Sequence, residues 1–361
     1  MQTQAQLSIT SPNTLSLWQT QAQPSITPLS TSSPQQTQAW LLASVLAALD
    51  IPSADWCLSF LLALHQHTPP AQPNTHLATD VYDTSSTPAQ FGSMQAQLHA
   101  WLCLLQDYPD VCYCDQMAGM IHHGCLLGYK GPLHNTNCLV TNLPISKDSH
   151  EHLCHKITAH LAEGHLMFVG PADVLVESPI GVVPKLCSTK LCTIHHLSYP
   201  RCPTTSTPPS VNSGINLSFV HIQYELIGQL VEFVRANPNC HLWKGNLEDA
   251  FCHVVTAVSD ATLLGFQYEG ICYCENALTF GGRSSPFLFN LVAEFLHWVV
   301  AACLPPSWPV NHYLDDTFGT VPAEKASTLV FFPIWVLTLA SAALGLHLSA
   351  KKTFTNLTHL E

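Results

Sequence analysis

Hydrophobic and polar positions divide the chain into three stretches. The first, residues 1–93, is mostly Ser, Thr, Gln and Pro, with two short apolar pieces inside the range 39–66. Polar tracts of this kind bury too little apolar surface to offset the entropy lost on ordering, so we expect a disordered, low-complexity N-terminal region. Each apolar piece (40–49 and 56–65) is nearer ten residues than twenty, which favours short buried or interaction helices over membrane spans.

Helical periodicity dominates the second stretch, residues 94–165, and strands mix with helices in the third, residues 166–361. Helices are predicted at 94–105, 115–123, 151–164, 222–236 and 286–302, and strands at 181–184, 191–195, 241–247, 261–268 and 271–274. Glu269-Gly270 is expected to form a hairpin turn, and a second hairpin is expected around residue 314. This mixture predicts an α+β fold.

Residues 329–346 form an uncharged run that is interrupted by Pro333. By hydropathy alone the run is a candidate membrane helix. A proline near its start and Gly345 near its end are more typical of a buried helix, so we expect no membrane contact here.

Composition argues against a nucleic-acid-binding protein. Only 10% of the 361 residues are charged, and 24 Asp+Glu outnumber 12 Lys+Arg, which gives a net charge of −12. Arginine occurs only at Arg201, Arg235 and Arg283. Proteins that bind a duplex neutralise its phosphates with Lys and Arg and usually carry a basic face.

Motifs argue the other way, beginning with Tyr313-Leu314-Asp315-Asp316. Two adjacent acids at the tip of a short hairpin are poorly placed for a core but well placed to hold a divalent cation, because Mg²⁺ prefers carboxylate oxygens. Polymerases use two such ions to stabilise the attacking and leaving oxygens of a phosphoryl displacement. Upstream lie an acidic strand end, 244–251, and a Gly/Ser-Pro loop followed by a helix, 278–295. Glycines at such a junction let the backbone approach a nucleotide closely.

An acidic strand end, a glycine loop with a helix and a Tyr-x-Asp-Asp hairpin, in that order, resemble the palm of a reverse transcriptase. Segments 178–185, 194–200 and 210–215 resemble the fingers of retrotransposon enzymes, and Tyr108-Pro109-Asp110 and 128–132 resemble the segment before them. The chain is most similar to reverse transcriptases of fungal retroelements of the tyrosine-recombinase (DIRS-like) kind, over roughly residues 100–361. The resemblance implies fingers and a ferredoxin-like palm within 166–361, preceded by a helical segment at 94–165. The chain is expected to stop before the thumb.

The resemblance also implies an activity, RNA-directed DNA polymerisation, with two Mg²⁺ or Mn²⁺ ions, an RNA or DNA template-primer and dNTPs. Asp315 and Asp316 match the metal-binding carboxylates, and the third carboxylate of the family stands where this chain has Asn246. Seven further positions match the nucleotide site, namely Asp249, Ala250, Phe251, Phe280, Gly281, Lys352 and Lys185. Because asparagine removes a bridging anion, we expect this copy to be catalytically impaired.

Further departures indicate a degenerate copy. Leu191 and Cys192 stand where the family pattern has tryptophan and arginine, and Thr279 stands for a proline. Cysteine (15) and histidine (21) are abundant, and single C→T or G→A transitions turn CG-containing arginine codons into cysteine or histidine codons. Cys192, Cys252 and His165 are positions where arginine is expected. Depletion of CG dinucleotides in the coding DNA would test this origin.

Two alternatives remain open. The groups 112–125, Cys272-x-Cys274 and Cys240-His241 carry zinc ligand types but not the usual spacing, so no structural zinc is expected. The chain could instead be a non-enzymatic interaction or membrane-associated protein with a fortuitous Tyr-Leu-Asp-Asp. The polar N-terminal start favours an intracellular protein, cytoplasmic or nuclear, whose thiols stay reduced.

Overall fold

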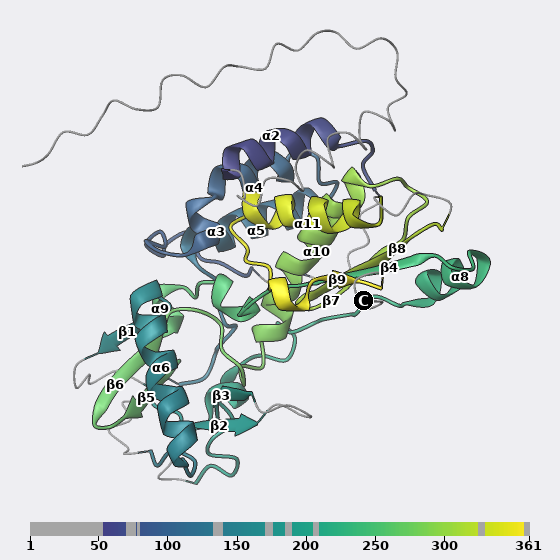
Figure 1. Ribbon diagram of the computed structural model, residues 1–361. Helices are drawn as coiled ribbons and strands as arrows, with labels where there is room; N and C mark the ends of the chain where they lie inside the picture. Colours follow the sequence, from purple (N-terminus) through teal and green to yellow (C-terminus); the bar gives the residue numbers. More distant parts are fainter. Residues whose placement is uncertain are drawn as a thin grey trace, which may run out of the picture.

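The protein is described here by a computed structural model, which places residues 53–69, 77, 80–132, 140–169, 176–184, 190–204, 209–323 and 329–356. Two lobes are visible in Figure 1. One combines a four-stranded sheet with most of the helices, and the other combines the long helix α6 with the remaining strands. Helices and sheets are mixed as expected, and all pairs of named strands are antiparallel.

The first lobe is built around the apolar helix α10 (Ser285–Cys303), nearly all of whose side chains are buried. Trp101 stacks on Phe295 at 5.1 Å between ring centroids, and its indole Nε1 donates to the Leu344 carbonyl at 2.9 Å. These contacts join the N-terminal helices to α10 and α11. The helices of this lobe are α2 (Ala54–Leu64), α3 (Ser93–Ala96), α4 (Leu98–Leu105), α5 (Val111–His123), α10 and α11 (Phe332–Ala343).

The sheet of the first lobe has the strand order β7-β8-β4-β9. Its strands are β7 (Val310–Tyr313), β8 (Asp316–Val321), β4 (His241–Asn246) and β9 (Phe354–Thr355). Helices α10 and α11 contact β7 and β4 respectively and cover the sheet on one side. The remaining short elements of the chain are α7 (Val211–Gly214), α8 (Gly228–Ala236), η1 (Ala250–His253), α9 (Val258–Ala261), η2 (Leu329–Phe331) and η3 (Ala350–Lys352).

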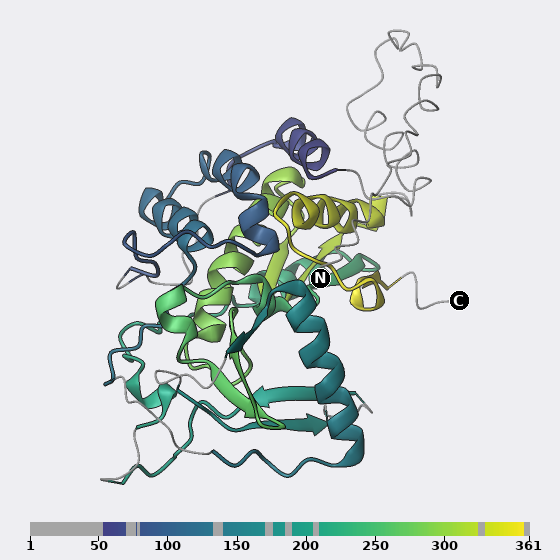
Figure 2. The same cartoon turned by 90° about the vertical axis from the view of Figure 1, so that its left-hand side faces the viewer.

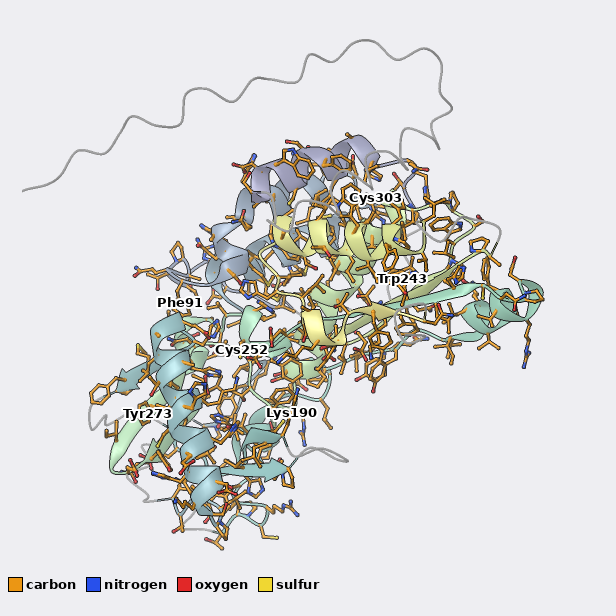
Figure 3. All side chains as sticks on the ribbon, in the orientation of Figure 1. Phe91, Lys190, Trp243, Cys252, Tyr273 and Cys303 are labelled. Atoms are coloured by element: carbon orange, nitrogen blue, oxygen red, sulfur yellow. The ribbon has the colours of Figure 1, made fainter. Side chains whose placement is uncertain are left out.

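The second lobe contains α6 (Lys147–Glu163), which contacts β1, β2 and β3 (Figure 2). Ser146 caps its start by accepting from the Ser149 amide, and Gly164, at φ 76°, ends it in the left-handed conformation that glycine tolerates. Three strands pair in the order β1 (Leu166–Val169), β6 (Ile271–Glu275), β5 (Gly265–Tyr268), and a separate pair joins β2 (Ile180–Pro184) to β3 (Leu191–His195). Figure 3 shows Lys190 and Tyr273 in this lobe, Trp243 and Cys303 in the other, and Cys252 between them.

Three predicted segments differ from the structure. The segment 80–93, expected to belong to the disordered N-terminal region, packs against α5. Val81 is fully buried and its amide donates to Gln116 Oε1 at 2.8 Å, and the Ala89 amide donates to the His122 carbonyl. Tertiary partners on α5 thus order a segment whose composition is typical of disorder. Residues 1–52, including the apolar piece 40–49, lie outside the described part of the chain.

The other two differences concern element starts. The predicted helix 222–236 begins only at Gly228, because Glu225 turns inward to meet His297 and His312. The predicted strand 261–268 begins only at Gly265, because α9 and a turn precede it. Leu263 and Leu264 lie in this turn and are both buried.

Within the described residues one helix, α10, is long and apolar enough to cross a membrane, and 83% of its most apolar window is buried inside the protein. A core helix passes the same test, so this is weak support for a membrane span. The uncharged run 329–346 instead forms η2 and the shorter helix α11, and Gly345 follows at φ 71°.

Candidate active site

Three polar side chains expected to form the catalytic centre meet at the end of the β7-β8 hairpin. In the register of β4 and β8, Asn246 stands opposite Asp316. The Asn246 amide Nδ2 donates to Asp315 Oδ2 at 2.6 Å and to Asp316 Oδ1 at 2.7 Å. The structure therefore brings together all three residues matched to the family's carboxylates.

Two lysines complete this group. Lys352 Nζ donates to Asn246 Oδ1 at 2.7 Å, and Lys244 Nζ pairs with Asp316 Oδ2 at the same distance. Lys244 lies two residues before Asn246 and shares its face of the strand, because side chains alternate along β-strands. Two carboxylates and two ammonium groups thus balance around one neutral amide.

The backbone is strained on both sides of this centre. Leu314, in the hairpin turn, has φ 50°, and Asp249, after β4, has φ 44°. Left-handed backbone is uncommon for a leucine and costs on the order of 1 kcal/mol or more. Strain of this kind collects where the surrounding structure holds a functional geometry.

A cavity of about 450 Å³ opens beside the centre and lies between the two lobes. Its size is typical of small-ligand sites. It is lined from α6, β3, the turn after β4, the loop before α10, the hairpin tip and η3. Asp315 lines it, as do the matched residues Asp249, Ala250, Phe251, Phe280 and Lys352.

Cations are concentrated in this cavity. Four of the chain's nine lysines line it, namely Lys156, Lys190, Lys351 and Lys352. Four acids, Glu248, Asp249, Glu275 and Asp315, line it as well. The lining therefore carries as many acids as lysines, whereas the chain as a whole has a net charge of −12.

An aromatic wall closes one side of the cavity. Phe251 is buried and packs against Phe280, with 4.8 Å between ring centroids, and against Phe289. Phe280 is half-exposed. Phe251 is therefore a core aromatic that also reaches the cavity.

Asp249 is joined to the second lobe by an ion pair with Lys156 of α6, at 3.0 Å. Burial alone raises the pKa of Asp249, but the hydrogen bond and charge of Lys156 outweigh burial and lower it. Burial likewise lowers the pKa of Lys156, and Asp249 more than reverses this. Both groups are held charged at the cavity edge.

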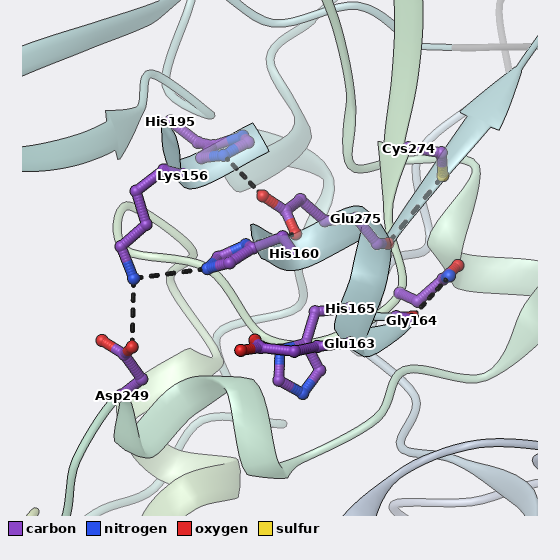
Figure 4. A network of polar contacts seen from close by, with 10 residues as sticks. Lys156, His160, Glu163, Gly164, His165, His195, Asp249, Cys274 and Glu275 are labelled. Carbon is purple, nitrogen blue, oxygen red and sulfur yellow. Dashed lines mark hydrogen bonds and ion pairs between the residues drawn. The ribbon is translucent and has the colours of Figure 1, made fainter. Parts of the chain in front are cut away.

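Behind this pair, Glu275 forms a buried network with histidines of the second lobe (Figure 4). Its two oxygens contact His195 Nε2 at 3.2 Å and His160 Nδ1 at 3.8 Å, and His160 Nε2 lies 3.4 Å from Lys156 Nζ. Burial raises the pKa of Glu275, yet the hydrogen bonds and charges of His160 and His195 prevail and hold it at about 2.

This network predicts acid sensitivity. Because the folded pKa of Glu275 lies below its ordinary value of 4.5, its contribution to stability is present above about pH 4.5 and is lost as the pH falls towards 2. The difference is worth roughly 3 kcal/mol. We expect the gap in unfolding free energy between the unmodified chain and Glu275→Gln, measured in urea, to be large at pH 6 and to shrink across this range. A gap that is constant with pH would contradict it.

The cavity lining does not account for two of the matched residues. Gly281 does not line the cavity: its φ is 114°, and a Cβ there would lie 1.9 Å from the His195 carbonyl oxygen. Lys185 lies outside the described residues. Sequence reasoning missed Lys156, Lys190 and Lys244. Strand alternation could have predicted Lys244, and the position of Lys190 beside the fingers motif could have predicted that residue. No sequence spacing connects Lys156 to Asp249.

The residues present do not fit a pair of divalent ions. Asp315 and Asp316 offer suitable oxygens, but the Asn246 amide nitrogen stands between them as a donor. Lys244 pairs with the second oxygen of Asp316, and Lys352 donates to the Asn246 amide oxygen. A cation bridging this position would meet an N–H dipole of the wrong sign.

No protein-family model matches the chain, and no similar sequence is found among curated proteins. Among solved structures it is similar to the native prototype foamy virus protease-reverse transcriptase, with a TM-score of 0.45 and 18% identity over 62% of this chain and 27% of that one. It is also similar to the foamy viral protease-reverse transcriptase dRH in complex with ds DNA, with a TM-score of 0.44 and 15% identity over 81% and 46%. The chain spans less than half the length of either protein.

Proposed function

We propose that this chain is the fingers and palm of a retroelement reverse transcriptase, of the DIRS-like kind, that keeps a nucleotide pocket but has an impaired catalytic centre. The contact that carries the proposal is the convergence of Asn246 with Asp315 and Asp316, from motifs almost 70 residues apart in the chain. In a membrane-associated or interaction protein with a fortuitous Tyr-Leu-Asp-Asp, nothing would bring these side chains together.

The second support is the cavity. Its lysines suit a triphosphate, and Asp249, Ala250 and Phe251 form one continuous wall beside Asp315. Lys190 and Lys352 approach from different lobes, so a phosphate chain between them would be held from two sides. Ammonium groups act on phosphate as point charges and need no bidentate geometry.

The expected chemistry is binding without efficient transfer. Phosphoryl transfer depends mainly on positioning and on stabilising developing charge. The lysines and the aromatic wall provide positioning, whereas the centre lacks the third carboxylate. We therefore expect dNTP binding to survive and incorporation to be weak or absent.

Equilibrium binding of dTTP tests this proposal. Lys190→Ala and Lys352→Ala should each weaken binding about tenfold or more, because a charge-assisted contact contributes roughly 1.5–3 kcal/mol. Lys147→Ala, at an exposed lysine outside the cavity, is the matched control and should leave binding unchanged. Equal affinity in all four proteins would place the ligand elsewhere. In parallel, primer extension on poly-rA with Mg²⁺ or Mn²⁺ compares the unmodified chain with Asp315→Asn.

A further inference from the structure

A second polar cluster lies at the base of the catalytic hairpin, apart from the cavity. It consists of Glu225, which precedes α8, His297 on α10, and His312 on β7, one residue before Tyr313. His312 is almost fully buried, and the side chains of Glu225 and His297 are 10% and 20% exposed. Three separate elements thus place three side chains that can act as metal ligands at one point.

The three ligand atoms form a tight triangle. Glu225 Oε1 lies 2.7 Å from His297 Nδ1 and 3.4 Å from His312 Nδ1, and the two Nδ1 atoms are 3.1 Å apart. Nitrogen and oxygen ligands held at about 2.0–2.1 Å in tetrahedral geometry lie roughly 3.3 Å from one another. The triangle therefore has nearly the dimensions of one face of a zinc coordination sphere.

Hydrogen atoms on the two imidazoles do not satisfy all three atoms of this triangle. If both Nδ1 atoms carry hydrogen, the two N–H groups face each other across 3.1 Å. If only His297 does, the lone pair of His312 is left facing the carboxylate oxygen. A cation satisfies all three atoms at once, since an ionised carboxylate and neutral imidazoles each present a lone pair.

The carboxylate is also oriented from outside the triangle. Its other oxygen, Oε2, accepts from the His312 backbone amide at 2.9 Å and lies 3.3 Å from Asn311 Nδ2. Fixed outer contacts of this kind are what hold ligands in place around metals.

From this geometry we infer a first-row transition-metal site, best suited to Zn²⁺, formed by Glu225, His297 and His312. Two imidazoles and one carboxylate are an established zinc ligand set that leaves a fourth position for water. Bound metal would tie α10 and the segment before α8 to the strand that carries Tyr313. The inference does not depend on the polymerase assignment.

Another cluster in the described residues offers a comparison. His160, His165 and Cys252 also bring their ligand atoms within 4.8 Å of one another. Lys156 Nζ stands 3.4 Å from His160 Nε2, and an ammonium group there repels a cation. None of the Cys/His motifs weighed from the sequence forms a comparable cluster within the part of the chain that the structure describes.

Zinc titration of the full chain, stripped with a chelator and then dialysed, tests the site. A chromophoric chelator competes for the zinc, so only a site that binds zinc more tightly than the chelator is counted. Scattered surface histidines bind zinc too weakly to pass this affinity threshold. We expect one ion per chain above that threshold. Glu225→Gln and His297→Gln should each weaken binding by at least about 100-fold, while His160→Gln and Cys252→Ser leave it unchanged. Glutamine keeps hydrogen-bonding capacity at both positions, and far-UV circular dichroism checks that each variant is folded.

Cobalt substitution identifies the ligand atoms. Co²⁺ at the inferred site should show the visible absorption of a four-coordinate ion without a thiolate charge-transfer band. A thiolate band that disappears in Cys252→Ser, stoichiometric binding that persists in Glu225→Gln, or no binding above the chelator threshold would each overturn the inference.

Discussion

Gly281→Ala should destabilise the chain by at least about 3 kcal/mol. Its φ of 114° is a conformation that alanine rarely adopts, and strain of this kind costs about 1–3 kcal/mol. The added Cβ would also lie 1.9 Å from the backbone oxygen of His195, which cannot move aside as a flexible side chain would.

The loop cannot retreat from that clash without losing contacts. The His195 amide donates to the Phe280 carbonyl at 2.9 Å, and Asn212 Nδ2 donates to the Gly281 carbonyl at 2.8 Å. Breaking each of these bonds adds roughly 1 kcal/mol. Phe280 would also move, so the aromatic wall of the cavity should open and dTTP binding should weaken with stability.

Gly228→Ala provides the matched control. Gly228 is the first residue of α8, and a Cβ there meets nothing within 4 Å. Alanine is the better helix former, so this change should be neutral or slightly stabilising. Urea unfolding followed by circular dichroism separates the two variants. Equal midpoints would mean that the glycine loop does not rest on the end of β3.

The family pattern placed Gly281 near a nucleotide, and the structure gives it a packing role. The difference shows what ordered motifs predict well. They predicted that Asn246 and Asp315 would converge, because both occur at the ends of strands in one sheet. The hydrophobic pattern and the hairpin signal predicted the 191–195 strand and the Glu269-Gly270 turn, where both residues have positive φ. Each of these features depends on a few neighbouring residues, so it can be predicted from the sequence.

Contacts between distant segments could not be predicted in this way. Lys156 and Asp249 are 93 residues apart, and neither belongs to a charge pattern that indicates the other. The Glu225, His297 and His312 cluster likewise follows no spacing rule, since it joins three separate elements. Segment 80–93 is ordered by α5 even though its composition resembles that of a linker. In each case the information lies in the fold.

In Asn246→Asp, a bound metal ion should replace the Asn246 amide as the group that stabilises Asp315 and Asp316. In the unmodified chain the Asn246 side chain donates to both carboxylates, at 2.6 and 2.7 Å, and is buried. Aspartate removes both donors and leaves three carboxylates facing two lysines. Without metal we expect a loss of several kcal/mol, because a hydrogen bond to a charged group contributes roughly 1.5–3 kcal/mol.

Divalent cations should reverse that loss. Three carboxylate oxygens converging on one point make the hard-cation site that the unmodified chain lacks. The midpoint temperature of thermal unfolding of Asn246→Asp is therefore expected to rise strongly on adding Mg²⁺ or Mn²⁺. The midpoint temperature of the unmodified chain should change little. This measurement responds to the metal even if no nucleotide is incorporated.

Incorporation in the primer-extension assay should rise with metal binding, about tenfold or more above the unmodified chain, but only to a partial level. Cys192 lines the cavity where the family has an arginine, and the missing charged contact costs roughly 1.5–3 kcal/mol, which is at least about tenfold in rate. Asn246→Asp combined with Cys192→Arg should therefore exceed Asn246→Asp alone. Neither substitution supplies contacts that position the primer, so incorporation by the double variant should still be partial.

Asp315→Asn, alone and combined with Asn246→Asp, is the blank for both measurements. Activity that survives in Asp315→Asn would show that the metal site lies elsewhere. Activity of the unmodified chain that disappears in Asp315→Asn would show that an asparagine suffices at position 246, and that Lys244 yields Asp316 to a cation once a nucleotide is bound. A cation response confined to Asn246→Asp would instead identify the amide as the group that keeps metal out, since the two lysines are common to both proteins.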